Sequence, residues 1–584
     1  MNGLTLLAIA GAVLLGGYFI YSRILSRILG VDPSRPTPAN TLRDDIDYVP
    51  AHPTVLFGHH FAAIAGAGPI VGPVLAAEFG WASVALWILL GCVFIGAAHD
   101  MIALHLSVRH EGKSIGTVIG ELLGPGGRVA FLLFCWSALI LVVAEFTRQI
   151  AATFVSNPEI ASASLLFIAE AIIFGLCVYR FKMGVLLASS IFVPLMFAFV
   201  WIGSLIPFDL VKMGLDAGAA QTVWTLVLLA YCFFASTMPV WLLLQPRDYL
   251  NAYLLYAMMI LGVAGVVFAH PHIQMEAFTS FAAEGRGGVQ MLFPFLFVTV
   301  ACGACSGFHA LVASGTTAKQ LASEKSTRLV GYGAMLLEGL LATLALIGVA
   351  GTWDGAGYLH TIQTVKEGGL GVEPVAMFAG SLAGFFEKVL TAFGAGEAAA
   401  QSGVAVARSF MLLAVSAFLM TSVDAATRLA RFTWQELFPV KQGVALTAAR
   451  KTVRNMYTGT AIVVALVAML LLGNAETAKS LWTNFASANQ LLASLTLLTA
   501  SLWLLRNGKN MYIAFIPMCF MLATSLTAVV QLLIKGVKSW YALGFAAGFM
   551  GPGLMSICTA ALLVLAVFTF ALGVKAFMRA NITK

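Results

Sequence analysis

The sequence predicts an all-α polytopic membrane protein with about 15 transmembrane helices in a single membrane domain. Of its 584 residues, 60% are hydrophobic and only 10% are charged, whereas a soluble domain carries roughly 25% charged residues. The mean hydropathy is +0.92. Apolar blocks of about 20 residues, the length that crosses a hydrocarbon core of about 30 Å, recur along the chain. This composition excludes an ordinary globular enzyme.

The expected spans are mostly uninterrupted apolar runs bounded by charged or proline-containing loops. They cover 3–22, 54–78, 82–105, 128–151, 162–181, 184–206, 221–245, 250–269, 290–318, 329–351, 403–427, 455–473, 485–505, 512–534 and 553–575. Segment 375–393 is apolar but rich in glycine and carries Glu387 and Lys388, so we expect it to be re-entrant or peripheral. The first span has no basic segment ahead of it and no clear cleavage site, so we expect a retained helix.

The distribution of basic residues predicts the orientation of these spans. With the N-terminus outside and the C-terminus inside, most of the 33 lysines and arginines fall in inner loops, as the positive-inside rule requires. This pattern fits a multi-pass protein of the bacterial cytoplasmic membrane, in contact with lipids. The net charge of +7 therefore reflects loop topology. No stripe of lysine and arginine is interleaved with stacking aromatics, so we expect no nucleic-acid partner.

Two expected spans contain helix-breaking residues at membrane depth. These are Gly66, Gly68, Pro69 and Pro73 in 54–78, and Ser236, Thr237, Met238 and Pro239 in 221–245. Irregular backbone at this depth is tolerated only where it lines a cavity or is buried in protein. The two spans are five apart and cross in opposite directions, and paired breaks of this kind are typical of a transporter binding site. The alternative is that these glycines and prolines merely kink their helices.

The paired breaks predict a core of leucine-transporter type, built from two inverted repeats of five helices. Residues 54–435 would hold this core. Residues 1–53 would add one N-terminal helix and a cytoplasmic loop, and 436–584 about four additional C-terminal helices. The whole chain, 1–584, is expected to be one transporter domain.

Three strings of the sequence resemble the carbon starvation protein A (CstA) family. They are HHFAAIAGAGP (59–69) with the nearby 79–81 and 99–101, CGA (302–304) with SGFHAL (306–311) and SGTTAKQL (314–321), and TSVDAATR (421–428). The resemblance implies an importer of the cytoplasmic membrane in nutrient-limited cells, with peptides and pyruvate as family substrates and proton coupling in pyruvate importers. Cys305 and a shorter C-terminal part depart from larger members, which leaves the substrate open.

The substrate is expected at the two breaks. The N-terminus of a half-helix presents free backbone N–H groups and a partial positive charge, which suits the carboxylate of pyruvate or of a peptide. The residues predicted to line the substrate site are Gly66, Ala67, Gly68, Pro69, Ser236, Thr237, Met238 and His309.

Ionisable residues inside spans are functional candidates, because each costs about 3 kcal/mol or more on insertion scales. They are His59, His60, Glu78, His99, Asp100, Glu145, Arg148, Glu170, His309, Glu338, Arg408 and Asp424. The predicted proton-coupling set is His59, His60, His99, Asp100, Glu145 and Asp424. Its centre is Asp100 with His59 or His60, because a buried carboxylate beside a histidine can exchange one proton. A purely structural pair is the alternative.

Other chemistry is weighed against simpler explanations. Glu145 and Arg148 lie three residues apart, so they either gate the outer vestibule or neutralise each other, and we favour the latter. Ser314, Thr316 and Thr317 could ligate a cation, but bonding to their own helix carbonyls is favoured.

No metal or other cofactor is expected. Zinc-compatible ligand types occur in two places, Cys302 and Cys305 with His309, and His59 and His60 with His99 and Asp100. A single CxxC in an apolar span is a weak signal, and adjacent histidines on a helix point in different directions.

The sequence therefore predicts a secondary importer of small peptides or pyruvate-like carboxylates, with H⁺ favoured over Na⁺ as the coupling ion. The alternative is a membrane sensor that binds such a nutrient without moving it. An intramembrane enzyme is not expected, because no nucleophile–base pair stands out.

Overall fold

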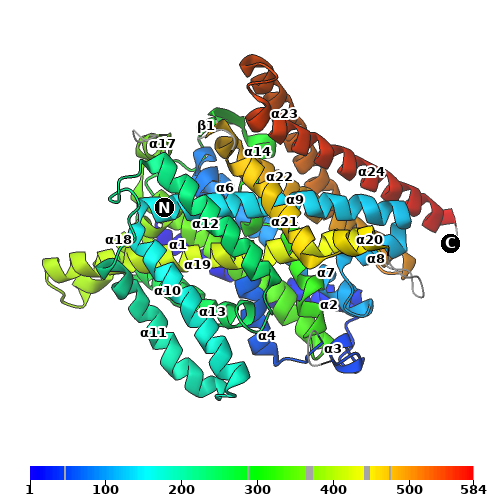
Figure 1. The fold of residues 1–584 in the computed structure, drawn as a ribbon, viewed down its shortest axis with the longest axis horizontal. Coiled ribbons are helices and arrows are strands. Elements are labelled where there is room, and N and C mark those ends of the chain that lie inside the picture. Colours follow the sequence, from blue (N-terminus) through cyan, green and yellow to red (C-terminus); the bar gives the residue numbers. More distant parts are fainter. Residues whose placement is uncertain (45–47, 286–287, 364–372, 440–446, 473–474, 583–584) are drawn as a thin grey trace.

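The computed structural model describes residues 1–44, 48–285, 288–363, 373–439, 447–472 and 475–582, and almost all of this chain is helical (Figure 1). The helices are α1 Gly3–Gly16, α2 Ser22–Leu29, α3 Pro38–Thr41, α4 Pro53–Ile64, α5 Gly68–Ala76, α6 Trp81–Gly91, α7 Ala97–Arg109, α8 Ile115–Leu123, α9 Pro125–Ser156, α10 Pro158–Gly175, α11 Val185–Leu205, α12 Ala217–Thr237, α13 Leu244–Ala269, α14 Leu292–Thr299, α15 Gly307–Gly315, α16 Ala334–Thr352, α17 Gly355–Gln363, α18 Pro374–Ala392, α19 Glu397–Leu437, α20 Ala448–Val453, α21 Met456–Leu471, α22 Ala475–Arg506, α23 Tyr512–Leu543 and α24 Leu554–Ile582. Strands β1 Ala282–Gly285 and β2 Gly288–Met291 pair antiparallel.

Thirteen helices of the described chain are long and apolar enough to cross a membrane, or 14 when the bent pair α4–α5 is taken as one span. The polytopic all-α prediction is confirmed, but the predicted number of spans is not. Two expected spans fall short, since 290–318 is broken into α14 and α15 and 455–473 yields the 16-residue α21. One further helix passes the same test, because 375–393 lies in the continuous α18.

The break predicted in 54–78 is confirmed. Helix α4 ends at Ile64, Ala65–Ala67 are not helical, and α5 starts at Gly68 after a bend of 47°. The amide of Gly66 donates to the carbonyl of Ile64 at 2.8 Å, which closes a tight turn. Pro69 then occupies the first turn of α5, where a missing N–H costs nothing.

The second break lies elsewhere than predicted. Ser236 and Thr237 are the last residues of α12, and the chain turns through 238–243 before the separate helix α13 begins. Met238 is extended, as expected for a residue that precedes proline. The prediction of an interrupted span at 236–239 is therefore wrong, because Pro239 marks a connection between two helices.

The interruption that partners α4–α5 lies between α14 and α15. Residues 301–303 form a short 3₁₀ turn, and Cys305 and Ser306 are not helical. Helix α4 packs against α15, while α5 packs against α14 and the 3₁₀ turn. The first half of each interrupted helix therefore lies beside the second half of the other, so the two run in opposite directions. The division into two repeats of five helices stays a prediction.

Glycines allow the two interrupted helices to cross closely. A Cβ on Gly68 would lie 2.5 Å from both Cβ and Sγ of Cys302. A Cβ on Gly72 would lie 2.3 Å from the carbonyl oxygen of Val300. A side chain at either position would require the backbones to separate.

The core of the bundle includes a helix from the C-terminal third. The apolar window of α22 is 94% buried, against 22% for α11. Helix α22 packs against α9 and α15, so this C-terminal helix is buried against helices of residues 54–435. The division into a core and additional helices stays a prediction. The α10–α11 pair and the α23–α24 pair lie at opposite edges of the molecule (Figure 1).

Candidate functional site

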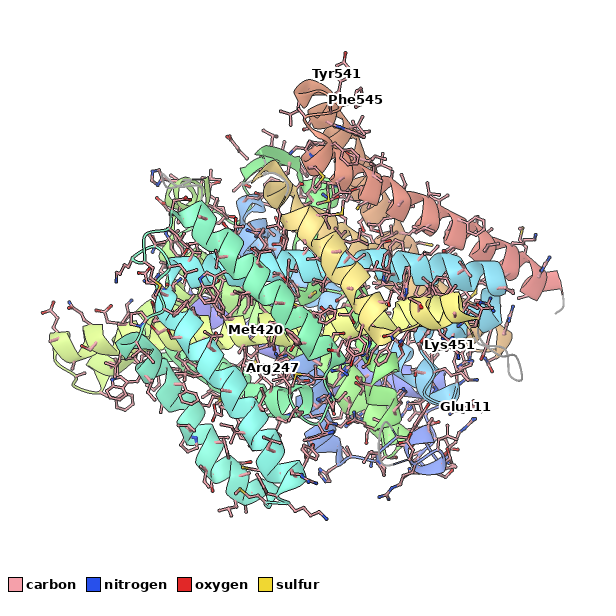
Figure 2. All side chains as sticks on the ribbon, in the orientation of Figure 1. Glu111, Arg247, Met420, Lys451, Tyr541 and Phe545 are labelled. Carbon is pink, nitrogen blue, oxygen red and sulfur yellow. The ribbon has the colours of Figure 1, made fainter. Side chains whose placement is uncertain are left out.

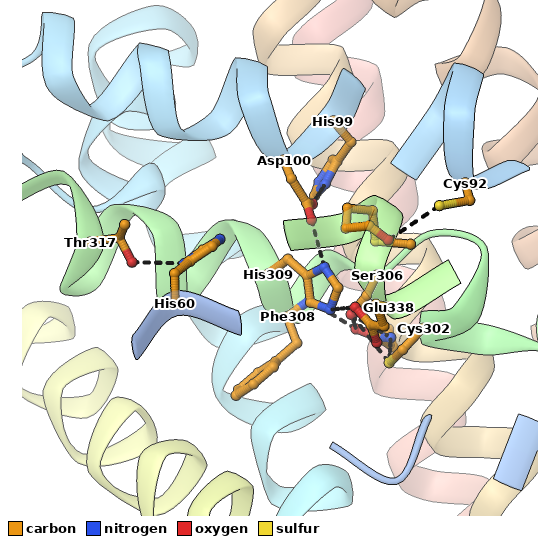
Figure 3. A network of polar contacts seen from close by, with 12 residues as sticks. His60, Cys92, His99, Asp100, Cys302, Ser306, Phe308, His309, Thr317 and Glu338 are labelled. Atoms are coloured by element: carbon orange, nitrogen blue, oxygen red, sulfur yellow. Dashed lines mark hydrogen bonds and ion pairs between the residues drawn. The ribbon is translucent and has the colours of Figure 1, made fainter. Parts of the chain in front are cut away.

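Four ionisable side chains meet directly behind the second break (Figure 3). Asp100 on α7 accepts from Nδ1 of His99 at 2.7 Å through one oxygen and from Nδ1 of His309 at 2.7 Å through the other. The Nε2 atom of His309, on α15, lies 3.3 Å from a carboxylate oxygen of Glu338 on α16. All four side chains are fully buried. We call these residues the Asp100 cluster.

The Asp100 cluster has capacity for one more proton. The contact between His309 and Glu338 is close enough for an ion pair but is not aligned as a hydrogen bond, and both oxygens of Glu338 lack a hydrogen-bond partner. With Asp100 and Glu338 ionised and His309 protonated, the cluster carries one net negative charge. Net charge in a buried site is costly. One added proton on Glu338 neutralises the cluster and turns this carboxylate into a group that can donate a hydrogen bond.

Cys302 lies at the edge of the Asp100 cluster and is held by the core helix α22. The amide nitrogen of Asn489 donates to Cys302 Sγ at 3.4 Å and to Ser306 Oγ at 3.1 Å. Its amide oxygen accepts from the backbone N–H of Phe308 at 2.9 Å. Asn489 therefore fixes the non-helical segment that precedes α15. Sequence reasoning missed Asn489 because it placed α22 outside the core.

One group of metal-compatible ligand types is present in the described chain. Ligand atoms of Cys302, His309 and Glu338 lie within 4.8 Å of one another. Cys305 is not part of this group, so the structure does not bring the predicted CxxC pair together with His309. Of the second predicted set, His99 and Asp100 are in contact, whereas His60 bonds Thr317 and His59 faces Asp248.

The expected pairing of Asp100 with His59 or His60 is wrong. His60 Nδ1 bonds Thr317 Oγ1 at 2.8 Å in the buried interior. His59 Nδ1 instead faces a carboxylate oxygen of Asp248 on α13 at 3.9 Å. The correct partner, His309, follows the second break, and the sequence could reveal it only if that break were recognised.

A second buried cluster joins α12, α13 and α19. Figure 2 labels Arg247, the member of this cluster on α13. Arg247 Nη1 contacts both Asp424 and the hydroxyl of Tyr231 closely, and Tyr231 donates to Asp424 at 2.7 Å. Asn251, one turn after Arg247, donates to Thr421 Oγ1 at 2.5 Å. Asp424 is thus paired with an arginine rather than standing as a free proton carrier. We call Tyr231, Arg247, Asp248, Asn251 and Asp424 the Arg247 cluster.

Sequence reasoning missed Arg247 through an error in a helix boundary. The expected span 221–245 ran past the true end of α12, which placed Arg247 in an inner loop. The available signal was Pro246, which lies in the first turn of α13, a position that proline favours. A helix started there would have put Arg247 inside a span, opposite Asp424.

A third polar group lies on α9. Arg148 donates to both oxygens of Glu145, at 2.9 and 3.1 Å, and to Glu373 at 3.3 Å. Gln149 donates to Glu145 at 2.7 Å. The predicted contact between Glu145 and Arg148 is confirmed, and Glu373, which precedes α18, was not foreseen. The two glutamates, Arg148 and Gln149 form one connected group, in which only the amide oxygen of Gln149 lacks a partner. Glu145 therefore lies apart from the Asp100 cluster.

The predicted substrate residues at 236–238 lie at the C-terminal end of α12, which is unfavourable for an anion. Arg431 donates to the carbonyl of Ser236 at 2.9 Å, and Arg428 donates to those of Ala235 and Met238 at 2.9 Å. A helix C-terminus carries partial negative charge, and these carbonyls already have partners. Thr237 bonds back to the Phe233 carbonyl at 3.0 Å.

The hydroxyls considered for a cation mostly bond to their own helix. Ser314 donates to the Ala310 carbonyl at 2.7 Å and Thr316 to the Val312 carbonyl at 3.0 Å, as favoured from the sequence. Thr317 is engaged by His60.

Three remaining ionisable candidates lie apart from the clusters. Glu170 is buried, and neither of its carboxylate oxygens has a partner in the described chain. Glu78 is buried at the end of the bent span, and Arg408 is exposed on α19.

The first break contains backbone N–H groups without hydrogen-bond partners. The amides of Ala67 and Gly68, at the start of α5, make no hydrogen bond to another residue in the part of the chain that the structure describes. A Cβ on Gly66 would lie 2.8 Å from Ser422 Oγ on α19 and 3.3 Å from the Phe146 ring on α9. The Ser422 hydroxyl also lacks a partner. The backbone donors of this break are therefore unused, while the space beside Gly66 is filled by Ser422 and Phe146.

A comparison with protein families matches the carbon starvation protein CstA family over residues 2–367 and 362–528. The chain belongs to this family. The peptide transporter CstA of Escherichia coli (strain K12) is 33% identical over 574 residues, which cover 90% of this chain and 81% of that protein. The pyruvate/proton symporter BtsT of the same organism is 34% identical, with 88% and 79% covered.

Relatives in this family extend to other bacteria. The peptide transporter CstA of Bacillus subtilis (strain 168) is 33% identical and covers 90% of this chain and 89% of its own length. This CstA family member is therefore a membrane transport protein. Among solved structures, MhsT in complex with L-phenylalanine aligns with 88% of this chain and 98% of its own at 12% identity and a TM-score of 0.47.

Proposed function

We propose that this CstA family member is a proton-coupled importer of a small nutrient that carries a carboxylate, of the peptide or pyruvate class. The relatives' names supply these two classes and proton coupling in one of them. The protein would act in the bacterial cytoplasmic membrane, with its N-terminus outside and its C-terminus inside. It would act as a transporter and not as an enzyme, and it would need no resident cofactor.

The observation that carries the proposal is the Asp100 cluster. Two carboxylates and one bridging imidazole are buried together at 2.7 and 3.3 Å, and no lysine or arginine of the described chain forms a hydrogen bond or ion pair with the cluster. Such a group alternates between one net negative charge and neutrality by binding one proton. His309 lies in the first turn of α15, so this change of charge occurs directly beneath the second break.

The substrate carboxylate would bind at the first break. The partner-free amides of Ala67 and Gly68 and the positive end of α5 suit an anion. Gly66 and Pro69 shape the turn, and Ser422 offers a hydroxyl. The 3₁₀ turn of the second break packs directly against α5, so the proton site and the substrate site share one crossing of helices.

The test is uptake by purified protein in proteoliposomes, with labelled dialanine or labelled pyruvate under an imposed proton or sodium gradient. We expect an inward proton gradient to drive accumulation of at least one substrate. Asp100→Asn is expected to retain counterflow exchange and lose proton-driven accumulation, because an amide cannot change charge. Glu111→Gln, which alters an exposed carboxylate, is the matched control.

Two outcomes would contradict the proposal. Accumulation by neither gradient, with binding retained, would favour the sensor. Wild-type accumulation by the Asp100→Asn variant would remove the Asp100 cluster from the coupling step.

A further inference from the structure

We propose that the face of α13 formed by Arg247 and Asn251 is a second binding subsite, which receives a carboxylate together with a neighbouring N–H group of the ligand. The inference rests on the proposed function. It places a second binding site for the same substrate between the first break and the end of the bundle where α4 starts. It also favours a peptide-like ligand over pyruvate.

The first observation is an unused edge of a buried guanidinium. Arg247 is 1% exposed, and Nη1 contacts Asp424 and Tyr231. Its Nε and Nη2 atoms have no hydrogen-bond partner. Together these two atoms form the fork that binds a carboxylate through two parallel hydrogen bonds. The Nε atoms of Arg428 and Arg431 also lack a partner, but the guanidinium groups of both donate to backbone carbonyls at the end of α12.

The second observation is a set of unused acceptors on residues close to Arg247 in α13. The amide nitrogen of Asn251 donates to the Ala417 carbonyl at 3.1 Å and to Thr421 Oγ1, which leaves Oδ1 without a partner. One oxygen of Asp248 is also without a partner. Asn251 is four residues after Arg247, so both lie on one face of α13.

The mixture of donors and acceptors defines the ligand. A peptide offers a carboxylate to Arg247 and an N–H or ammonium group to Asn251 or Asp248. Pyruvate has a carboxylate and a keto oxygen, both of which are acceptors only. Buried polar groups that stay unpaired oppose binding, so pyruvate would leave the acceptors of this subsite unsatisfied.

The subsite lies near both the surface of the protein and the first break. The side chain of His59, which lies 3.9 Å from Asp248, is 21% exposed, so the Arg247 cluster lies close to the surface of the protein. On the other side, Thr421 contacts Asn251 and is followed by Ser422, which lies against Gly66. One turn of α19 therefore borders both the break and the subsite.

The first experiment uses the wild-type protein in detergent and measures the affinity for dialanine, dialanine amide and pyruvate by calorimetry. Dialanine amide lacks the carboxylate, so we expect its affinity to be lower by at least about 10-fold. We expect a similar loss for pyruvate. Equal affinities for dialanine and its amide would overturn the inference, and would mean that only water occupies the Arg247 edge.

The second experiment measures uptake by Arg247→Lys, with Arg431→Lys as the matched control. Lysine keeps a positive charge beside Asp424 but lacks the fork. We expect KM for dialanine to rise at least about 10-fold in Arg247→Lys, with the proton-driven accumulation ratio at saturating dialanine unchanged, and to stay within about 2-fold in Arg431→Lys. An unchanged KM in Arg247→Lys would refute the subsite while leaving the proposed function intact.

Failure of the proposed function gives a different result. In that case the wild-type protein accumulates neither dialanine nor pyruvate under any gradient. Should Arg247→Lys not fold, KM for dialanine in Asn251→Ser takes its place, and an unchanged KM overturns the inference. The amide alone cannot separate the two sites, because the carboxylate is also expected at the first break.

Discussion

The two buried clusters contain similar side chains but use their hydrogen-bonding capacity in different ways. In the Asp100 cluster, carboxylates and histidines contact one another, and the spare capacity is that of Glu338 to take a proton. In the Arg247 cluster, one edge of the guanidinium and the nearby acceptors have no partner, and the adjacent His59 is partly exposed. The first arrangement suits a single proton, while the second suits a ligand with several polar groups.

The two clusters also differ in whether they can change their net charge, which affects the stability of the protein. The Asp100 cluster can adjust its charge by gaining or losing a proton. The pair of Arg247 and Asp424 cannot, because the guanidinium stays protonated. Removing one partner of such a pair leaves a buried charge uncompensated.

The largest expected effect is therefore on the Arg247 cluster. Asp424→Ala is expected to lower the free energy of unfolding by about 3–5 kcal/mol, measured as a fall in Tm in detergent. The double variant Arg247→Met with Asp424→Leu is expected to recover most of this stability and still fail to transport dialanine. A stable Asp424→Ala single variant would show that Arg247 finds its compensation elsewhere.

The next effect tests the Asp100 cluster through its second carboxylate. Glu338→Gln is expected to reduce proton-driven uptake about 100-fold, equivalent to about 2.7 kcal/mol, because glutamine keeps the shape of the side chain but cannot take a proton. Counterflow exchange is expected to stay within about 2-fold of wild type. Equal loss of both activities would mean that Glu338 shapes the site and does not couple.

A smaller effect concerns the crossing that holds the Asp100 cluster in place. Gly68→Ala is expected to cost about 1–3 kcal/mol of stability, because the added Cβ would lie 2.5 Å from Cys302. Gly384→Ala on α18 is the control, since nothing lies within 4 Å of its Cβ. Thermal unfolding in detergent distinguishes them, and equal Tm values would show that the crossing adjusts freely.

The smallest effect is expected at an exposed ion pair. Lys113 lies 3.1 Å from Glu111, and both are well exposed. The hydrogen bond to Glu111 raises the pKa of Lys113, so any stabilisation is present below pH about 10 and is lost as pH rises through the folded pKa. Lys113→Ala is expected to change stability by less than about 0.5 kcal/mol at pH 7. A loss comparable to that of Asp424→Ala would contradict the distinction between buried and exposed charge.

The sequence predicts the helices of this protein and one of their breaks better than it predicts which side chains of different helices contact one another. Glycine and proline locate the break at Gly66 because they act on their own backbone. The break at 301–306 contains no proline, so composition alone did not mark it. The pairing of Asp100 with His309 depends on how α7 and α15 are rotated, which is decided by packing. Arg247 was missed through a boundary error of a few residues, the usual uncertainty of helix ends.

The close crossing of the interrupted helices constrains how the transporter can move. With no room for a methyl group between Gly72 and the Val300 carbonyl, α5 and α14 are expected to travel as one rigid unit. Alternating access would then depend on rotation of the other two half-helices, α4 and α15, relative to this rigid unit. His59, on α4, would move away from Asp248 as α4 rotates outward.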